Sequence, residues 1–524
     1  QDRCRGDKAD PLDVIYPVAM AEQHRLLLDI RTLLHVETRR SRDVLDPECA
    51  TDIATHLGFD DRLDLSRALA DAARTIDATL TQALTTARHV LRRPRNYRRR
   101  PVDLGVVDAG DELRLSRNQS LDDPGLVLRV GAASARTGLP VSAATWRRLA
   151  STPPLPTPWP ATATGDFFAL LGSSEHTARV VGDMDTHGLW ERIVPEWVHI
   201  RGLMPGEPSH INTIDVHCLN TVANCAHVSV NVSRPDLLLL AALFHDIGKG
   251  YNRPHSQVGA EMVTRMAARM GLNPRDRMCV QTLVAEHTLL ARLAATHDPW
   301  DDAAVDTLLD ALHYDLLTVE LLQELTEADA RATGPAVWTA HLNHAVTTLA
   351  NRARNALTAV HPHKPHVSTP TDLGLTSSGE LAHVHWRGND IIPILALIAA
   401  KGWNIVTARI VAERTTVRAE FDVRAMHVGG FNQEEFIQGY KSGVFSALPA
   451  LEPAATATHW FGSVLEVRTV DRRGALGALL GVIPDYTWCT VELPGSTMIA
   501  RFHLCGAFDR AAVERSITRV LATG

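Results

Sequence analysis

The chain has 524 residues, more than one ordinary domain requires, so we expect about two to four domains. Hydrophobic residues make up 45% of the chain and charged residues 22%, the proportions of a soluble globular protein. The formal net charge of −7 argues against a general nucleic-acid binder, and no apolar run approaches the roughly 20 residues that span a bilayer. Neither nucleic acid nor a membrane is therefore expected as a partner.

The N-terminal part, residues 1–100, is predicted to be a helical domain. The sequence begins with Gln1 among polar residues, so we expect no signal peptide and interpret the chain as a fragment or processed form. Within residues 12–92, apolar residues recur at intervals of three and four, for example over 18–34, which predicts helices. The basic stretch 92–100 is interpreted as a solvated loop, with contact to a polyanion as the alternative.

Two segments that contain prolines divide the rest of the chain. Residues 151–160 hold five prolines in ten, which excludes regular structure, and 101–164 is predicted to be a linker with this Pro-rich segment. Helical periodicity then resumes and predicts a second helical domain over 165–355. Another linker is predicted at 356–379; its three closely spaced histidines could bind a metal, but the neighbouring prolines favour a linker.

The second helical domain contains histidines and aspartates spread over about 110 residues, in the order His, His-Asp, Asp. The doublet His245-Asp246 ends the apolar run Leu237 to Phe244, and burying such groups at a helix end is costly unless something compensates them. A divalent cation is the simplest compensation, because neutral imidazole nitrogen and carboxylate oxygen are ligands that such ions take. In this order of residues the domain resembles the metal-dependent HD phosphohydrolases. The full set is His217, His245, Asp246, His255, His287 and Asp329.

The members of this set receive different expected roles. The metal ligands are expected to be His217, His245, Asp246 and Asp329, with Asp246 able to bridge two ions. His255 and His287 fit either a second metal or the substrate phosphate, and the catalytic group is expected to be His245, Asp246, Lys249, His255 and His287. Lys249 could balance phosphate charge or could be a structural lysine placed by the helix dipole. Among 25 histidines, an ordinary core or surface role is favoured for His210, His227 and His297.

The last 145 residues change character from helical to mixed helix and strand. The pattern predicts a strand, a helix and two strands, and then the same order again with a closing helix. The predicted elements are a strand at 380–386, a helix at 391–400, strands at 404–412 and 416–423, a strand at 463–470, a helix at 474–483, strands at 488–493 and 498–504, and a helix at 509–521. This indicates a duplicated ferredoxin-like β-α-β-β-α-β module, over 380–430 and 461–524 with an intervening segment 431–460. Such paired modules are expected to bind an effector.

The order of these parts resembles the bacterial PII uridylyltransferase/uridylyl-removing enzymes, a family of bifunctional nitrogen sensors. The matching motifs are Thr213-Ile-Asp-Val-His217, Phe244-His-Asp-Ile-Gly-Lys-Gly250, His255-Ser-Gln-Val-Gly259, the segment Leu325 to Pro335 with Trp338, and Val467-Arg-Thr-Val-Asp-Arg-Arg-Gly474. The resemblance covers essentially the whole chain but begins inside the family's helical domain, without its N-terminal nucleotidyltransferase domain. It implies a multidomain α+β protein with an N-terminal helical domain, an all-α HD domain and two C-terminal ACT domains.

The resemblance also implies an activity. The family removes UMP from the nucleotidylated PII signal protein with a divalent metal, Mg or Mn, with Zn or Fe as alternatives; some relatives handle AMP. Glutamine is the implied allosteric effector in this regulation of nitrogen metabolism, and Asp471 and Gly474 are the implied effector-binding residues. In the first module Trp386 and Asn389 replace the corresponding aspartate and glycine, so glutamine sensing is assigned to the second module or is lost.

Transferase activity is not expected of this chain. The motif Asp183-Met-Asp185 imitates the paired carboxylates of a nucleotidyltransferase, but no suitable strands precede it and the motif is interpreted as incidental. The activity is expected to be lost or to lie on a missing N-terminal part.

Two other functions stay open at the level of sequence. One is a different HD enzyme that hydrolyses a free nucleotide second messenger, and the other is an inactive remnant that acts only as a sensor. The seven cysteines are odd in number and form no CxxC pair, so free thiols in a reducing cytoplasm are expected.

Overall fold

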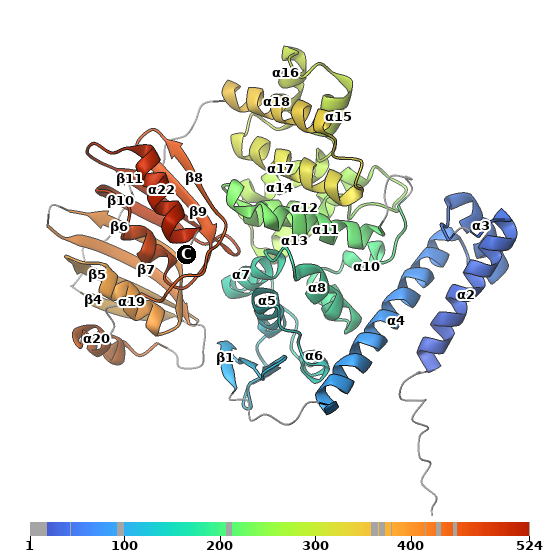
Figure 1. Ribbon diagram of the computed structural model, residues 1–524, viewed down its shortest axis with the longest axis horizontal. Helices are drawn as coiled ribbons and strands as arrows, with labels where there is room; N and C mark the ends of the chain where they lie inside the picture. The colour runs from blue at the N-terminus through green and yellow to red at the C-terminus, as the bar shows by residue number, and fades with distance from the viewer. Residues whose placement is uncertain are drawn as a thin grey trace, which may run out of the picture.

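The computed structural model describes residues 18–41, 43–91, 99–205, 212–357, 365, 373–378, 380–413, 415–425, 431–443 and 448–522. Figure 1 shows a helical arm on one side of a helical body and a β-sheet with its own helices on the other side. Residues 92–98 of the basic stretch and most of the linker predicted at 356–379 lie outside the described residues.

The arm consists of three helices, as the periodicity predicts: α2 (Val18–Thr38), α3 (Pro47–Leu57) and α4 (Arg62–Leu91). Asp46 caps α3 by accepting a hydrogen bond from the Cys49 N–H, and Gly58 ends it in the left-handed conformation at φ 78°. The three helices share a small hydrophobic core of their own. Two contacts bind α4 to the body: Ser66 Oγ donates to the Gly202 carbonyl at 2.9 Å, and Arg74 Nη1 pairs with Asp215 at 2.7 Å.

The segment 101–164, predicted to be a linker, is folded into strands and helices. It contains an antiparallel meander of β1 (Arg100–Asp103), β2 (Val106–Asp108) and β3 (Leu113–Leu115), followed by α5 (Leu126–Thr137), α6 (Ala143–Leu149) and α7 (Ala161–Leu171). Helix α5 is buried from Leu126 to Ala135 and belongs to the main hydrophobic core. The buried stretch includes Arg129, Gly131 and Ser134 among its apolar residues, so the sequence does not mark it as a buried helix. Residues 151–160 form no helix or strand, as their prolines predict.

The body is all-helical after α7. Its elements are α8 (Thr177–Thr186), α9 (Trp190–Ile193), α10 (Trp197–Ile200), α11 (Ile214–His227), η1 (Ser229–Asn231), α12 (Pro235–Phe244), α13 (His255–Met270), α14 (Pro274–Ala285), α15 (Leu289–Thr296), α16 (Asp302–Ala311), α17 (Leu316–Thr333) and α18 (Ala340–Ala356). One hydrophobic core runs through this body. Helix α12 lies at its centre and packs against α7, α11, α13, α14 and α17. The predicted apolar run is therefore buried on every side, and its end is fixed by its neighbours.

The C-terminal part is one eight-stranded antiparallel sheet in the order β4-β5-β7-β6-β10-β11-β9-β8. The strands are β4 (Leu373–Ser378), β5 (Leu381–Gly388), β6 (Trp403–Ala412), β7 (Val417–Ala425), β8 (Thr456–Phe461), β9 (Val464–Val470), β10 (Tyr486–Glu492) and β11 (Thr497–Leu504). Strands β6 and β10 pair at the centre and join the two halves. The helices α19 (Ile392–Ala400), α20 (Gln433–Lys441), α21 (Ala475–Leu480) and α22 (Arg510–Leu521) pack with the sheet in one core.

The duplication is confirmed, but the order of elements in each half differs from the predicted β-α-β-β-α-β. Each half runs strand, strand, helix, strand, strand, helix, because β4 and β8 precede the core strands that they pair with. Each forms a hairpin with the next strand, β4 with β5 and β8 with β9. The edge position of the sheet can be filled by a strand that comes either last or first in the module. When the strand comes first, a short hairpin pairs it with the next strand in the sequence. In the first half this strand falls inside the predicted linker 356–379.

Candidate metal centre

The six predicted residues come from five helices and meet at one end of α12. His217 lies on α11, His245 and Asp246 follow directly after α12, and His255 begins α13. His287 lies just beyond the end of α14, and Asp329 lies on α17. The packing of these helices around α12 therefore brings together residues that are distant in the sequence.

The first group is His217, His245 and Asp329. His217 Nε2 lies 3.0 Å from His245 Nε2 and 3.0 Å from Asp329 Oδ1. His245 Nε2 lies 3.5 Å from the same Asp329 oxygen. Both imidazoles are buried, and one ligand atom of each of the three residues falls within 4.8 Å of the others.

The second group is Asp246, His255 and His287. Asp246 Oδ1 lies 3.5 Å from His255 Nε2 and 3.7 Å from His287 Nε2. The other oxygen, Oδ2, lies 3.5 Å from His217 Nε2 in the first group and 2.8 Å from the ammonium of Lys249. Asp246 therefore lies between the two groups, with one oxygen directed to each, which is the arrangement expected of a bridging carboxylate.

Backbone contacts fix the tautomers of two histidines. His245 Nδ1 lies 2.8 Å from the Ala242 carbonyl, and His287 Nδ1 lies 2.9 Å from the Val284 carbonyl. Because a carbonyl oxygen accepts but does not donate, Nδ1 carries the proton in both rings. When each ring is neutral, as metal binding requires, its Nε2 lone pair is directed at the centre, which is how metal-binding histidines are usually held.

Burial and charge shift the pKa values of the centre in opposite directions. Burial alone would lower the pKa of His245, but the carboxylates of Asp246 and Asp329 raise it to about 9. Burial and the charge of His245 lower the pKa of His287 to about 4. Burial would raise the pKa of Asp246, yet His245 and Lys249 bring it down to about 2. The carboxylates are thus held ionised inside the protein, where a negative charge is costly without a cation.

The residues of the centre fit a divalent metal. Imidazole nitrogens and carboxylate oxygens are the ligands of such ions, and here they converge in two adjoining groups. The six residues that the sequence singles out are the six that converge, and Lys249 contacts Asp246 as a charge partner. His227 and His297 are exposed, in keeping with the ordinary role favoured for them, and His210 lies outside the described residues.

One pair beside the centre has no signal in the sequence. Asp215, two residues before His217, is buried and pairs with Arg74 of the arm. The two residues are 141 positions apart, so no local pattern links them. Asp215 lies inside the motif 213–217, which is the one feature that could have drawn attention to it.

The two residues singled out for an effector lie at the junction of the two halves of the sheet. Gly474 has φ 92° and precedes α21, and Asn404 Nδ2 of the first half donates to Asp471 Oδ2 at 3.0 Å. Burial raises the pKa of Asp471 to about 6 despite this hydrogen bond. A small cavity of about 40 Å³ is lined by residues of both halves, Asp471 and Gly474 among them.

Trp386, the residue expected to replace the aspartate in the first half, lies within strand β5 and not in the loop before α19. Trp386 is fully buried, and its Nε1 donates to Tyr440 Oη at 2.8 Å. Its ring also lies so close to Gly388 that a Cβ there would be 2.3 Å from Trp386 Cζ2. The indole therefore belongs to the core, and its polar atom is satisfied by the protein itself.

The motif Asp183-Met-Asp185 lies on helix α8, so its carboxylates do not follow a strand-turn. Asp185 accepts from Arg201 Nε at 2.9 Å, and Asp183 pairs with Arg179 at 3.5 Å. Both aspartates therefore have structural partners, which agrees with the interpretation that the motif is incidental.

The fold and the centre together define an enzyme domain of the metal-dependent HD class. Residues 214–332 match the family model of the HD domain. This range contains all six residues of the centre and its five helices.

The relatives name the family more closely. A bifunctional uridylyltransferase/uridylyl-removing enzyme of Corynebacterium glutamicum is 56% identical over 505 residues, which is 95% of this chain and 73% of that protein. Enzymes of the same description from Mycobacterium tuberculosis H37Rv and Streptomyces coelicolor are 36% and 38% identical, over 95% and 67% of this chain and 70% and 44% of their own lengths. The chain belongs to the bifunctional uridylyltransferase/uridylyl-removing enzyme family, and the predicted family is confirmed. Among the residues that the structure describes, every helix is too short or too polar to span a bilayer.

Proposed function

We propose that this chain hydrolyses the nucleotidyl group from the nucleotidylated PII signal protein and releases UMP, with AMP as the alternative group. The observation that carries the proposal is the convergence of His217, His245, Asp246 and Asp329 in a chain of the uridylyl-removing family. The nucleotidyl group is proposed to be carried by a tyrosine of PII. The proposed reaction forms a bond from phosphorus to water oxygen, breaks the bond from phosphorus to the tyrosine oxygen, and leaves a proton on that oxygen.

Each residue of the centre has a proposed task in this reaction. His217, His245, Asp246 and Asp329 hold the metal, Mg or Mn with Zn or Fe as alternatives, which supplies positive charge against the phosphate and activates water. Lys249 adds a second positive charge beside Asp246, where the phosphate oxygens come to lie. His287 is neutral at physiological pH because its pKa is low, so its Nε2 can accept a hydrogen bond or coordinate a metal ion. His255, whose side chain is 36% exposed, is the group of the centre best placed to exchange a proton with substrate and solvent.

We propose no transferase role for the described residues. The carboxylates that imitate a nucleotidyltransferase motif are held by arginines on a helix, as described above. The relatives carry both activities in their names, and this chain spans 73% of the relative from Corynebacterium glutamicum.

We further propose that the two halves of the sheet are ACT domains and that glutamine binds where they meet. The left-handed Gly474 lets backbone N–H groups approach a small amino acid, and Asp471 offers a carboxylate to its ammonium group. In the first half the corresponding aspartate is expected to be replaced by Trp386, which is buried in the core, so one site per chain is proposed. Glutamine controls hydrolysis only if it binds the hydrolysing state better than the resting state.

The test is the release of UMP or AMP from nucleotidylated PII in the presence of Mn²⁺, with and without glutamine. Metal-dependent release that is lost in Asp246→Ala supports the proposal, and its stimulation by glutamine supports the effector site. Release only from free guanosine tetraphosphate or a cyclic dinucleotide would assign the centre to another HD hydrolase. No release from any of these substrates by folded, metal-loaded protein would leave a sensor or an inactive remnant.

A further inference from the structure

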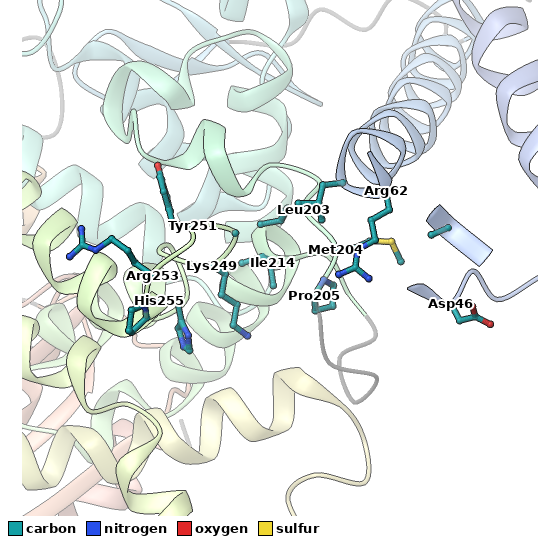
Figure 2. Close-up of a pocket in the computed structure, with 14 residues that line it drawn as sticks. Asp46, Arg62, Leu203, Met204, Pro205, Ile214, Lys249, Tyr251, Arg253 and His255 are labelled. Atoms are coloured by element: carbon teal, nitrogen blue, oxygen red, sulfur yellow. The ribbon is translucent and has the colours of Figure 1, made fainter. Parts of the chain in front are cut away.

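A cavity of about 350 Å³ lies between the helical arm and the metal centre. Figure 2 shows Arg62 entering it from the arm, while Lys249 and His255 approach from the body. The loop after α12, the residues Leu203 to Pro205 and Ile214 at the start of α11 complete its walls. Its volume is within the range of pockets that enclose a small molecule, about 300–1,000 Å³.

The cavity is continuous with the metal centre, because two residues belong to both. Lys249 lines the cavity and lies 2.8 Å from Asp246, and His255 lines it and lies 3.5 Å from the other Asp246 oxygen. A phosphate at the metal centre would therefore have the cavity directly beside it.

The lining combines an apolar surface with positive charge. Leu63, Leu203 and Ile214 supply the apolar part, and Arg62 and Lys249 supply cations. This is the chemistry that receives a planar base and a sugar on one side and a phosphate on the other. We propose that the cavity holds the nucleoside end of a nucleoside 5′-monophosphate and that Arg62, on the arm, contacts this ligand. The inference rests on the proposed function and assigns the substrate's nucleotide to a defined place in that site.

Glycines let the cavity take its shape. Gly250 has φ 85°, and a Cβ there would lie 2.7 Å from Leu203 Cδ2 and 3.0 Å from His199 Nε2. A glycine is therefore required for the loop to approach the chain between α10 and α11. The next residue, Tyr251, stacks on His199 with ring centres 3.8 Å apart, which holds the loop in this position.

The arm is fixed at the cavity by specific contacts. Arg74 binds Asp215 on α11, two residues before the metal ligand His217, and Ser66 binds the Gly202 carbonyl. These contacts set the position of the N-terminal end of α4, where Arg62 is the first residue. Arg62 forms no ion pair with any residue that the structure describes, whereas Arg253 at the rim pairs with Glu261.

The test compares Arg62→Ala with Arg25→Ala, which removes the same charge from an exposed position on α2 outside the cavity. Binding of UMP is measured by calorimetry with Mn²⁺ present, and inorganic phosphate is measured as the second probe. Arg62→Ala is expected to weaken UMP binding about tenfold, since a charge-assisted hydrogen bond is lost. Arg25→Ala is expected to bind as the unchanged protein does, and Arg62→Lys to fall between the two.

Kinetics on nucleotidylated PII give a second readout. Arg62→Ala should raise KM about tenfold with little change in kcat, because the contact is made equally before and during the reaction. UMP binding that is equal in Arg62→Ala and Arg25→Ala, or phosphate binding as tight as UMP binding, would overturn the inference. If the unchanged protein binds UMP but does not hydrolyse nucleotidylated PII, the proposed function fails while the cavity assignment survives. If the KM for nucleotidylated PII is unchanged in Arg62→Ala, the cavity assignment fails alone.

Discussion

Replacement of Asp471 by asparagine tests whether the buried charge in the proposed effector loop, Asp471 to Gly474, lowers the stability of this part of the protein. The pKa of Asp471 is raised from 3.8 to about 6, chiefly by burial, so the carboxylate is ionised at pH 7 in an environment that disfavours the charge. Each unit corresponds to about 1.36 kcal/mol, which gives about 3 kcal/mol. The residue is only partly buried, so we expect about 2 kcal/mol after solvent screening. The asparagine side chain would remove this cost, and its amide oxygen could still accept from Asn404.

The sign of the pH dependence follows from the direction of the shift. Between about pH 4 and pH 6 the folded state binds the proton on Asp471 and the unfolded state does not, so stability falls as pH rises through this window. Below about pH 4 the carboxyl is protonated in both states, and aspartate and asparagine should be equivalent. Above about pH 6 the whole cost is present, and Asp471→Asn should be the more stable protein.

The assay must be local, because a chain with several domains does not unfold in one step. Hydrogen exchange of peptides from β6 and β9, on either side of the loop, reports the opening free energy of this region. At pH 7 the variant should exchange about 30-fold more slowly, as about 2 kcal/mol corresponds to this factor. The difference in exchange rate between Asp471→Asn and the unchanged protein should decrease steadily toward pH 4. A difference that does not depend on pH, or greater protection of the unchanged protein at pH 7, would refute the reasoning.

Three further substitutions test the centre, the arm and the junction with the sheet. Gly248→Ala should reduce Mn²⁺ affinity and hydrolysis about 10- to 100-fold, because its Cβ would lie 2.1 Å from the His255 carbonyl oxygen and displace that histidine. An unchanged Mn²⁺ affinity in calorimetry would contradict this. Arg74→Ala should lower stability by about 2 kcal/mol, because Asp215 stays buried without its charge partner. Protection of α4 and α11 against hydrogen exchange should therefore fall, and Arg67→Ala is the control on the same helix. Arg424→Lys should keep basal hydrolysis and lower its stimulation by glutamine, since it loses one of two bonds to Asp166; undiminished stimulation would exclude this pair from the coupling.

Local patterns explain what could be predicted from the sequence. The doublet His245-Asp246 stands out because it ends an apolar run, and the burial of α12 on all sides is the cause of that run. The strands β6 and β7 are predicted within two residues of their ends because alternation marks a sheet that is covered differently on its two faces.

Long-range packing explains what could not be predicted. Helix α5 is buried over residues 126–135, and its one charged residue there is Arg129. This arginine pairs at 2.7 Å with Asp123, just before the helix, and at 2.7 Å with Glu380, which is 251 positions away at the edge of the sheet. Nothing within the helix shows that this charge has a partner. Arg62 likewise has no signal in the sequence, since an arginine at the start of a helix is ordinary until the fold places it at the cavity beside the metal centre.

The position of α7 offers a physical reason why an effector at the sheet could alter the metal centre. Near the middle of the helix Asp166 binds Arg424 of β7, and at the C-terminal end the Gly172 carbonyl accepts from Ser496 Oγ. The Ser496 carbonyl in turn accepts from the N–H of Asp471, so the proposed effector loop and the end of α7 share one residue. Helix α7 also packs against α12, whose end presents His245 and Asp246. Contact alone does not transmit a signal; the two ends must favour different arrangements of the same element. Because α7 is held to the sheet near its middle and at its C-terminal end, and packs against α12, a shift of the effector loop that moves α7 must also strain the contacts that orient the doublet.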